Sequence, residues 1–151
     1  MLKSSELKQK GFGAPRLFEV TENGSPIATL DSTSLSLEVP GAQYTVERHG
    51  AVGPEYKLKE GETTLATAKQ APMFNRYTVT CDGTEWDFKA IGITAQKFGL
   101  YQGEEQFGTI SAGGYFSRLK DITIDLPDEL PRPVQLFLLL NLVWKWTDTS
   151  S

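Results

Sequence analysis

The segment over residues 134–144 constrains the fold of this chain more than any other. It reads VQLFLLLNLVW, and its apolar residues cover every side of a helix rather than one stripe. A helix that is apolar all round must be buried on all sides or inserted in a membrane. The rest of the chain, or a lipid bilayer, therefore has to surround this segment.

The length of the segment and its polar residues favour burial in the protein. Crossing a bilayer takes about 20 mostly apolar residues, and runs of about 10 to 14 are more often buried helices. This run contains Gln135 and Asn141 and is followed by Lys145. We expect a buried helix at about 133–146, with contact at a membrane surface as the alternative and without a transmembrane span.

Strand patterns fill most of the chain before this helix. Apolar and polar residues alternate from about residue 16 to residue 126, between turn signals at Asn23-Gly24, Pro40-Gly41, His49-Gly50, Glu60-Gly61 and Gln102-Gly103. We count about ten or eleven strands in this way. The fold class is therefore mainly β, and the short spacing indicates an antiparallel barrel or sandwich.

The clearest hairpin has Asp82-Gly83 as its turn, a dipeptide that two-residue hairpin loops prefer. The alternation of its two strands predicts which side chains share a face. We expect an inner face of Tyr77, Val79, Cys81, Trp86, Phe88 and Ala90, and an outer face of Thr78, Thr80, Asp87 and Lys89.

Three prolines separate the last strand from the helix. Pro127, Pro131 and Pro133 lie between residues 126 and 133 and predict a stiff connector, with Pro131 or Pro133 opening the helix. A helix of roughly 20 Å would match the height of a seven-residue strand, about 23 Å. We expect residues 1–15 to form a partly disordered N-terminal segment and residues 16–151 to form one domain.

A weak internal repeat joins three parts of the strand region. Residues 58–62 and 65–67 (LKEGE and LAT) match residues 100–104 and 107–109 (LYQGE and FGT), and residues 22–25 and 27–29 (ENGS and IAT) form a looser copy. Each copy predicts a strand, a tight turn and a return strand with a small residue followed by Thr. We expect the small residues to make room for a bulky object inside the sheet, namely the terminal helix.

The order of these motifs resembles the tubby C-terminal-like superfamily. The motifs are FGLY at residues 98–101 with GTI at 108–110 in the return strand, IDLP at 124–127, and LFLLL at 136–140 with Trp residues nearby. The LURP-one-related and phospholipid-scramblase-like proteins are the most similar members. The resemblance covers the chain from about residue 16 onward and implies a closed antiparallel barrel of about twelve strands around a hydrophobic C-terminal helix. It also implies a non-enzymatic binding or interaction module.

Two sets of residues are candidates for binding. Tubby proteins bind phosphoinositides through basic side chains on the barrel, but none of these aligns with a residue of this chain. The strand pattern instead offers Lys57, Lys59 and Lys69, although acidic residues between them predict a mixed, solvated face. Tyr115 and Phe116 either form a partner-binding patch or cover one end of the barrel. The expected partner is an unidentified protein, or in the alternative an anionic lipid surface.

The sequence carries no signal for catalysis or for a cofactor. The single histidine, His49, precedes Gly50 and is typical of a turn, and no metal-binding or phosphate-binding motif is present. A net charge of −4 argues against nucleic-acid binding. The single cysteine, Cys81, suits packing in a reducing compartment, and the first ten residues lack the apolar core of a signal peptide. We therefore expect a cytoplasmic protein that is not an enzyme and has no metal or cofactor.

Overall fold

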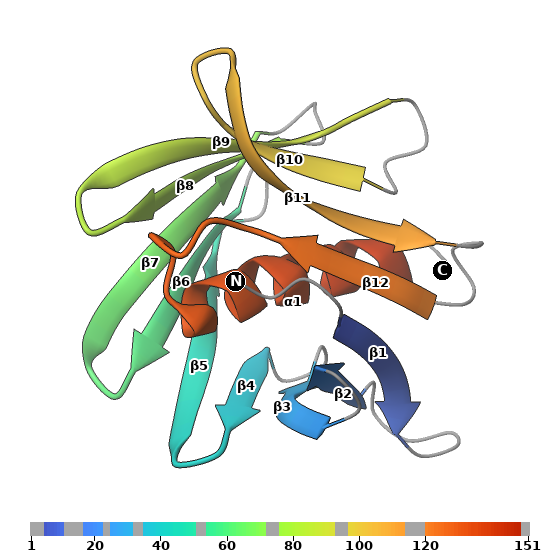
Figure 1. Cartoon of the computed structure of the whole chain (residues 1–151). Coiled ribbons are helices and arrows are strands. Elements are labelled where there is room, and N and C mark those ends of the chain that lie inside the picture. Colours follow the sequence, from blue (N-terminus) through green and yellow to red (C-terminus); the bar gives the residue numbers. More distant parts are fainter. Residues whose placement is uncertain are drawn as a thin grey trace.

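The computed structural model describes residues 5–10, 17–22, 25–31, 35–50, 54–71, 76–92, 97–113 and 120–148. These residues form twelve strands followed by one helix (Figure 1). The elements are β1 (Ser5–Lys10), β2 (Leu17–Glu22), β3 (Ser25–Asp31), β4 (Ser36–Val39), β5 (Ala42–His49), β6 (Glu55–Glu60), β7 (Thr63–Gln70), β8 (Arg76–Cys81), β9 (Thr84–Ala90), β10 (Lys97–Gln102), β11 (Glu105–Gly113), β12 (Lys120–Asp125) and α1 (Arg132–Asp148).

The twelve strands form a single sheet in which each strand pairs with its neighbours in the sequence. Every adjacent pair is antiparallel, as the short turns between strands require. The strands curve around α1, and the first and last strands, β1 and β12, contact each other (Figure 1). The expectation of a mainly β, antiparallel protein with one C-terminal helix is confirmed.

Strand β1 lies outside the region in which the sequence predicted strands. Its sequence, SELKQK, has Leu7 as its only strongly apolar residue, so it carries almost no alternation signal. It forms a strand because its backbone pairs with β2 along its whole length, from Ser5 opposite Glu22 to Lys10 opposite Leu17. The pairing partner, rather than local propensity, determines this element.

The β8–β9 hairpin follows the prediction. Asp82 and Gly83 have φ angles of 51° and 76°, and a type I′ turn requires positive φ at both positions. The predicted inner residues are buried, except that Ala90 is half-buried. The predicted outer residues are half-buried.

Two other predicted turns are shifted by one residue. Glu60 and Gln102 are the last residues of β6 and β10, and the turns consist of Gly61-Glu62 and Gly103-Glu104. The glycine has positive φ in both turns, 61° and 63°, and occupies the first central position. The turn predicted at residues 23 and 24 lies outside the described residues.

The three copies of the internal repeat share a β-bulge. Leu65 has no partner between the pairs Leu58–Ala66 and Lys59–Thr64, and Phe107 has none between Leu100–Gly108 and Tyr101–Gln106. Ile27 occupies the same position in the β2–β3 hairpin. All three bulged side chains are partly buried against the core. A bulge bends its strand and increases the local twist, so the repeat curves the sheet once in every four strands.

Helix α1 is buried on every side over residues 134–143. None of these ten side chains is more than 3% exposed, including the polar Gln135 and Asn141. The Gln135 amide donates hydrogen bonds to the carbonyl oxygens of Pro127 at 3.2 Å and Leu130 at 2.8 Å. The prediction of a buried core helix is therefore confirmed, although the helix begins one residue earlier and ends two residues later than expected.

The connector between β12 and α1 passes directly over Gly108. A Cβ atom at this position would collide with the carbonyl oxygen of Asp125 and would lie 3.0 Å from the Cα atom of Leu126. The small residue at this place in the repeat therefore makes room for the backbone that leads into the helix. In the other two copies the corresponding residues, Ala28 and Ala66, are buried in the core.

Candidate functional site

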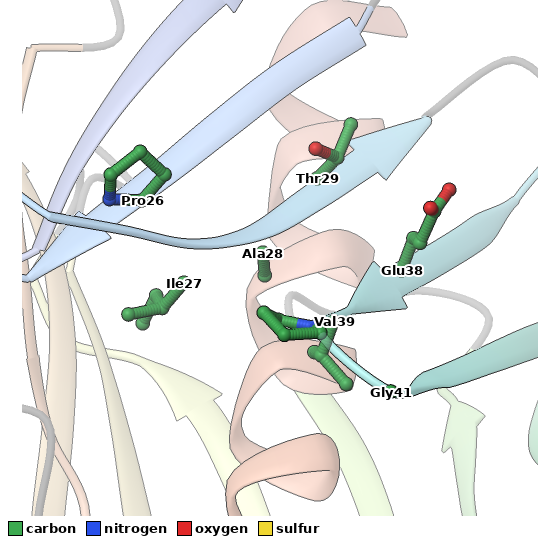
Figure 2. Close-up of a pocket in the computed structure, with 8 residues that line it drawn as sticks. Pro26, Ile27, Ala28, Thr29, Glu38, Val39 and Gly41 are labelled. Atoms are coloured by element: carbon green, nitrogen blue, oxygen red, sulfur yellow. The ribbon is translucent and has the colours of Figure 1, made fainter.

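The outer wall of the sheet has an opening between β3 and β4. It has a volume of about 270 Å³ and is lined by two short segments, residues 26–29 and 38–41 (Figure 2). Thr29 and Glu38 lie side by side on the facing strands, with α1 behind them (Figure 2). The opening is therefore a place where a ligand can contact the wall without entering the core.

The opening exists because the β3–β4 ladder stops early. The last pair is Thr29–Glu38, whereas the corresponding β7–β8 ladder continues for one more pair, from Thr67–Thr80 to Ala66–Cys81. In the third copy, the close approach of Leu126 to Gly108 fills the corresponding place. Of the three equivalent positions, the one at Ala28 lines this opening.

Two prolines line the opening. Val39 is the last residue of β4, and Pro40 and Gly41 form the turn into β5, with Gly41 at a φ of 83°. Pro26 lines the opening from β3. Neither proline has a backbone N–H to donate to a ladder. The opening is thus bounded by stiff residues and needs no rearrangement to form.

The lining combines apolar walls with one carboxylate. Pro26 and Pro40 are exposed, Ile27 and Val39 are half-buried, and the Glu38 side chain is exposed. Glu38 makes no hydrogen bond or ion pair with any residue that the structure describes. Some other carboxylates on the wall are paired, as in Glu22 with Arg132 at 3.4 Å and Asp87 with Arg76 at 3.0 Å. No described residue therefore competes with a ligand for the Glu38 carboxylate.

The predicted lysines lie together on the outer face of β6 and β7, but two of them are neutralised. Lys59 lies 3.4 Å from Glu47, and Lys57 lies 3.9 Å from Glu55. Lys69 is exposed and stands opposite Glu55 in the ladder. This face carries alternating charges, as the sequence indicated for a solvated surface, and lacks the concentrated positive charge of an anion site.

His49 belongs to the same face. It is the exposed last residue of β5, and its Nε2 lies 3.1 Å from the Glu47 carboxylate. Hydrogen bonds from His49 and then Lys59 lower the pKa of the Glu47 carboxyl group. These contacts form a surface ion-pair network and bring no nucleophile to the histidine. The other predicted binding residues, Tyr115 and Phe116, lie outside the described residues.

The remaining titratable groups of interest are buried in the core. Burial raises the pKa of the Cys81 thiol, so the unreactive protonated form is favoured. Burial also raises the pKa values of the Tyr77 and Tyr44 phenols. In the described part of the chain, no group of three or more His, Cys, Asp or Glu side chains is placed to hold a metal ion.

Comparisons with known proteins give no information about the site. A scan against models of protein families and searches of curated proteins and of solved structures found no match to this chain. No helix in the described ranges combines the length and the apolar character needed to cross a membrane.

Sequence reasoning did not identify the opening between β3 and β4. Its signal in the sequence is Pro26 within the return strand of a repeat copy, together with Pro40-Gly41 at the end of the next strand. A proline inside a strand indicates an edge or a bulge. The signal does not say which segments face each other, because that depends on the pairing of β3 with β4.

Proposed function

We propose that this chain is a non-enzymatic, cytoplasmic binding module of the tubby-like type. Its sheet closes into a twelve-stranded barrel around α1, and its ligands bind the outer wall at the opening between β3 and β4. The motifs that resemble the tubby C-terminal-like superfamily support the assignment to this type.

Two contacts support closure of the sheet into a barrel. Strands β1 and β12, at the two ends of the pairing order, contact each other. The Arg132 guanidinium at the start of α1 also lies 3.4 Å from the Glu22 carboxylate at the end of β2. A meander with an even number of strands places its first and last strands antiparallel, so they are oriented for pairing.

The filled interior is the observation that carries the proposed binding mode. Residues 134–143 of α1 are buried on all sides, and they pack with inward-facing residues of the strands in a single core. A ligand inside the sheet would have to displace this helix. The outer wall remains, and there the opening offers apolar walls together with a carboxylate that has no partner among the described residues.

The alternative function, binding to an anionic lipid surface, has less support. It would use Lys57, Lys59 and Lys69, and the first two lie beside carboxylates. Their attraction for phosphate groups is therefore partly cancelled. Co-sedimentation with phosphoinositide-containing vesicles tests this alternative, and salt-sensitive binding that is lost on replacing these three lysines would favour it over the opening.

Nuclear magnetic resonance with a chemically mixed fragment library tests the proposed binding mode. We expect the fragments that bind to shift backbone amides of residues 27–29, 38, 39 and 41, and to leave those of residues 134–143 unchanged. The library should include neutral, cationic and anionic compounds, so that the result does not depend on one ligand class. Shifts centred on α1 would contradict the proposal, as would a library without any fragment that contacts the outer wall.

A further inference from the structure

We infer that the opening between β3 and β4 receives an arginine side chain of a partner polypeptide. This inference rests on the proposed function and specifies its ligand. The volume of the opening is the first argument. Sites for small organic ligands usually have about 300 to 1,000 Å³, whereas this opening has about 270 Å³ and faces solvent. A space of this size suits one side chain that enters from a chain lying outside the wall.

Charge is the second argument. Glu38 supplies a carboxylate at the opening, and it makes no hydrogen bond or ion pair with any described residue. The lining contains no basic side chain, since its other members are Pro26, Ile27, Ala28, Thr29, Val39, Pro40 and Gly41. A cationic group is therefore the complement of this surface, and an anionic ligand would meet only repulsion.

The apolar lining distinguishes arginine from a small hydrated cation. The exposed rings of Pro26 and Pro40 offer apolar surface for the methylene stem, whereas Ile27 and Val39 are half-buried against the core. A guanidinium is more weakly hydrated than an ammonium and forms paired hydrogen bonds to a carboxylate. Arginine can thus use both parts of the opening at once, with its stem against the exposed prolines and its head at Glu38.

The open geometry favours a polypeptide over a free guanidinium compound. Pro26, Glu38, Pro40 and Gly41 are all exposed, so residues on either side of the arginine can contact the rim. The prolines and the ladder pair Thr29–Glu38 hold this rim in place before the ligand arrives. A preformed surface loses little conformational entropy on binding, which lets several weak contacts add.

Titration of the ¹⁵N-labelled full chain with a pentapeptide, acetyl-AARAA-amide, tests this inference. We expect shifts of the amides of residues 27–29, 38, 39 and 41. The same peptide with citrulline in place of arginine keeps the shape and removes the charge, and should bind about fivefold more weakly. Agmatine carries the guanidinium without flanking peptide groups, and should bind at least about tenfold more weakly than the pentapeptide.

A matched pair of variants tests whether the Glu38 carboxylate binds the guanidinium. Glu38→Gln should weaken binding of the arginine peptide about fivefold. Glu62→Gln should leave it unchanged, because Glu62 is also exposed and without a partner in the described part of the chain but lies in the β6–β7 turn. Since both substitutions keep the shape of a surface side chain, amide spectra of the free variants can verify that each is folded.

Three results would overturn the inference. They are an arginine peptide that causes no shift at the opening, a citrulline peptide that binds equally well, and agmatine that binds as tightly as the pentapeptide. If fragments of another class shift the same amides while the arginine peptide does not, the arginine inference fails and the proposed binding mode stands. If no compound of any class contacts the outer wall, both fail.

Discussion

Gly108 lies where the backbone of Asp125 and Leu126 crosses β11 on its way to α1. A methyl group at this position meets backbone atoms, which cannot move aside as a flexible side chain can. We expect Gly108→Ala to lower the free energy of unfolding by about 3 kcal/mol, as measured by urea denaturation.

Gly61→Ala is the matched control for Gly108→Ala. Gly61 has no neighbouring atom within 4 Å of the added methyl group, but its φ is 61°. Gly61→Ala should lower the free energy of unfolding by only about 1 kcal/mol, the cost of placing alanine in a left-handed conformation. Equal losses for the two variants would show that the close approach at Gly108 has no energetic effect.

Tyr77 makes the stability of the protein sensitive to alkaline pH. Burial raises the pKa of its phenol above the ordinary value of 10.0, and the nearby Tyr56 raises it further. The contribution of the neutral phenol is fully present below pH 10, where it is protonated in both states. As the pH rises above that value, only the unfolded chain ionises, so stability is lost at up to about 1.4 kcal/mol per pH unit.

Tyr77→Phe removes the ionisable group and should flatten this dependence. Urea denaturation at pH values between about 9 and 11.5 measures the slope for both proteins. The variant should lose stability less steeply by about 1 kcal/mol per pH unit. Parallel curves for the two proteins would contradict a buried phenol at this position.

Within α1, Gln135 and Asn141 are both buried but have opposite predicted effects. Gln135→Leu would remove a donor to two buried carbonyl oxygens and should cost about 2 kcal/mol, chiefly at Leu130, because the Pro127 oxygen still accepts from the Leu130 N–H. The Asn141 amide donates only to the Phe137 carbonyl, one turn earlier, at 2.9 Å. The side-chain oxygens of both residues lack a partner among the described residues, so only the donated bonds distinguish them. Asn141→Leu should therefore be neutral or should stabilise by up to about 1 kcal/mol.

Each of these two substitutions is the control for the other, because both place leucine in the same helix. Thermal and urea denaturation give the two changes in stability. If both variants lose stability equally, the hydrogen bonds of Gln135 to the connector do not distinguish the two sites.

Removal of the helix tests its role as the core of the sheet. A chain that ends at Leu130 lacks α1 and would expose the inner faces of the strands to water, so we expect it to aggregate or to remain unfolded. A chain that ends at Asp148 keeps the whole helix and should fold as the parent does. Circular dichroism and size-exclusion chromatography separate these outcomes, and a monomeric, folded chain ending at Leu130 would contradict the central position of the helix.

The helix and the hairpins could be predicted because their signals are local. A helix with apolar residues on every side has to be buried in any fold, and Asp82-Gly83 defines a turn with two residues. The strand β1 could not be predicted in this way, since its residues show no alternation and its pairing with β2 is a contact between segments. The repeat was visible in the sequence, but the bulge at Ile27, Leu65 and Phe107 was not.

For the whole molecule, closure of the barrel predicts slow hydrogen exchange at both ends of the pairing order. If β1 and β12 pair, their backbone amides should be protected to a degree similar to those of β2 and β11. If the sheet has two free edges, alternate amides of β1 and β12 should exchange much faster than those of their inner neighbours. Native-state exchange measured residue by residue gives the answer, with β2 and β11 as internal references.

The candidate site shows where sequence reasoning reached its limit. Lys57, Lys59 and Lys69 lie near one another, because they follow the alternation of adjacent strands. Their neutralisation by Glu47 and Glu55 depends on side-chain distances across the sheet. The lack of a described partner for Glu38 is likewise a property of the folded wall, since the sequence does not show which carboxylates find a basic partner.

The sequence by itself determined the periodic features of this protein: a mainly β chain, its clearest hairpin and a helix that has to be buried. These features depend on the order of polar and apolar residues over a few turns or pleats. The hydrophobic effect buries the apolar side of such a pattern in any fold. The tertiary structure decided the opening at Glu38, the close approach at Gly108 and the strand β1. Each of these depends on which distant segments meet, because a ladder, a collision or an ion pair needs both partners in place.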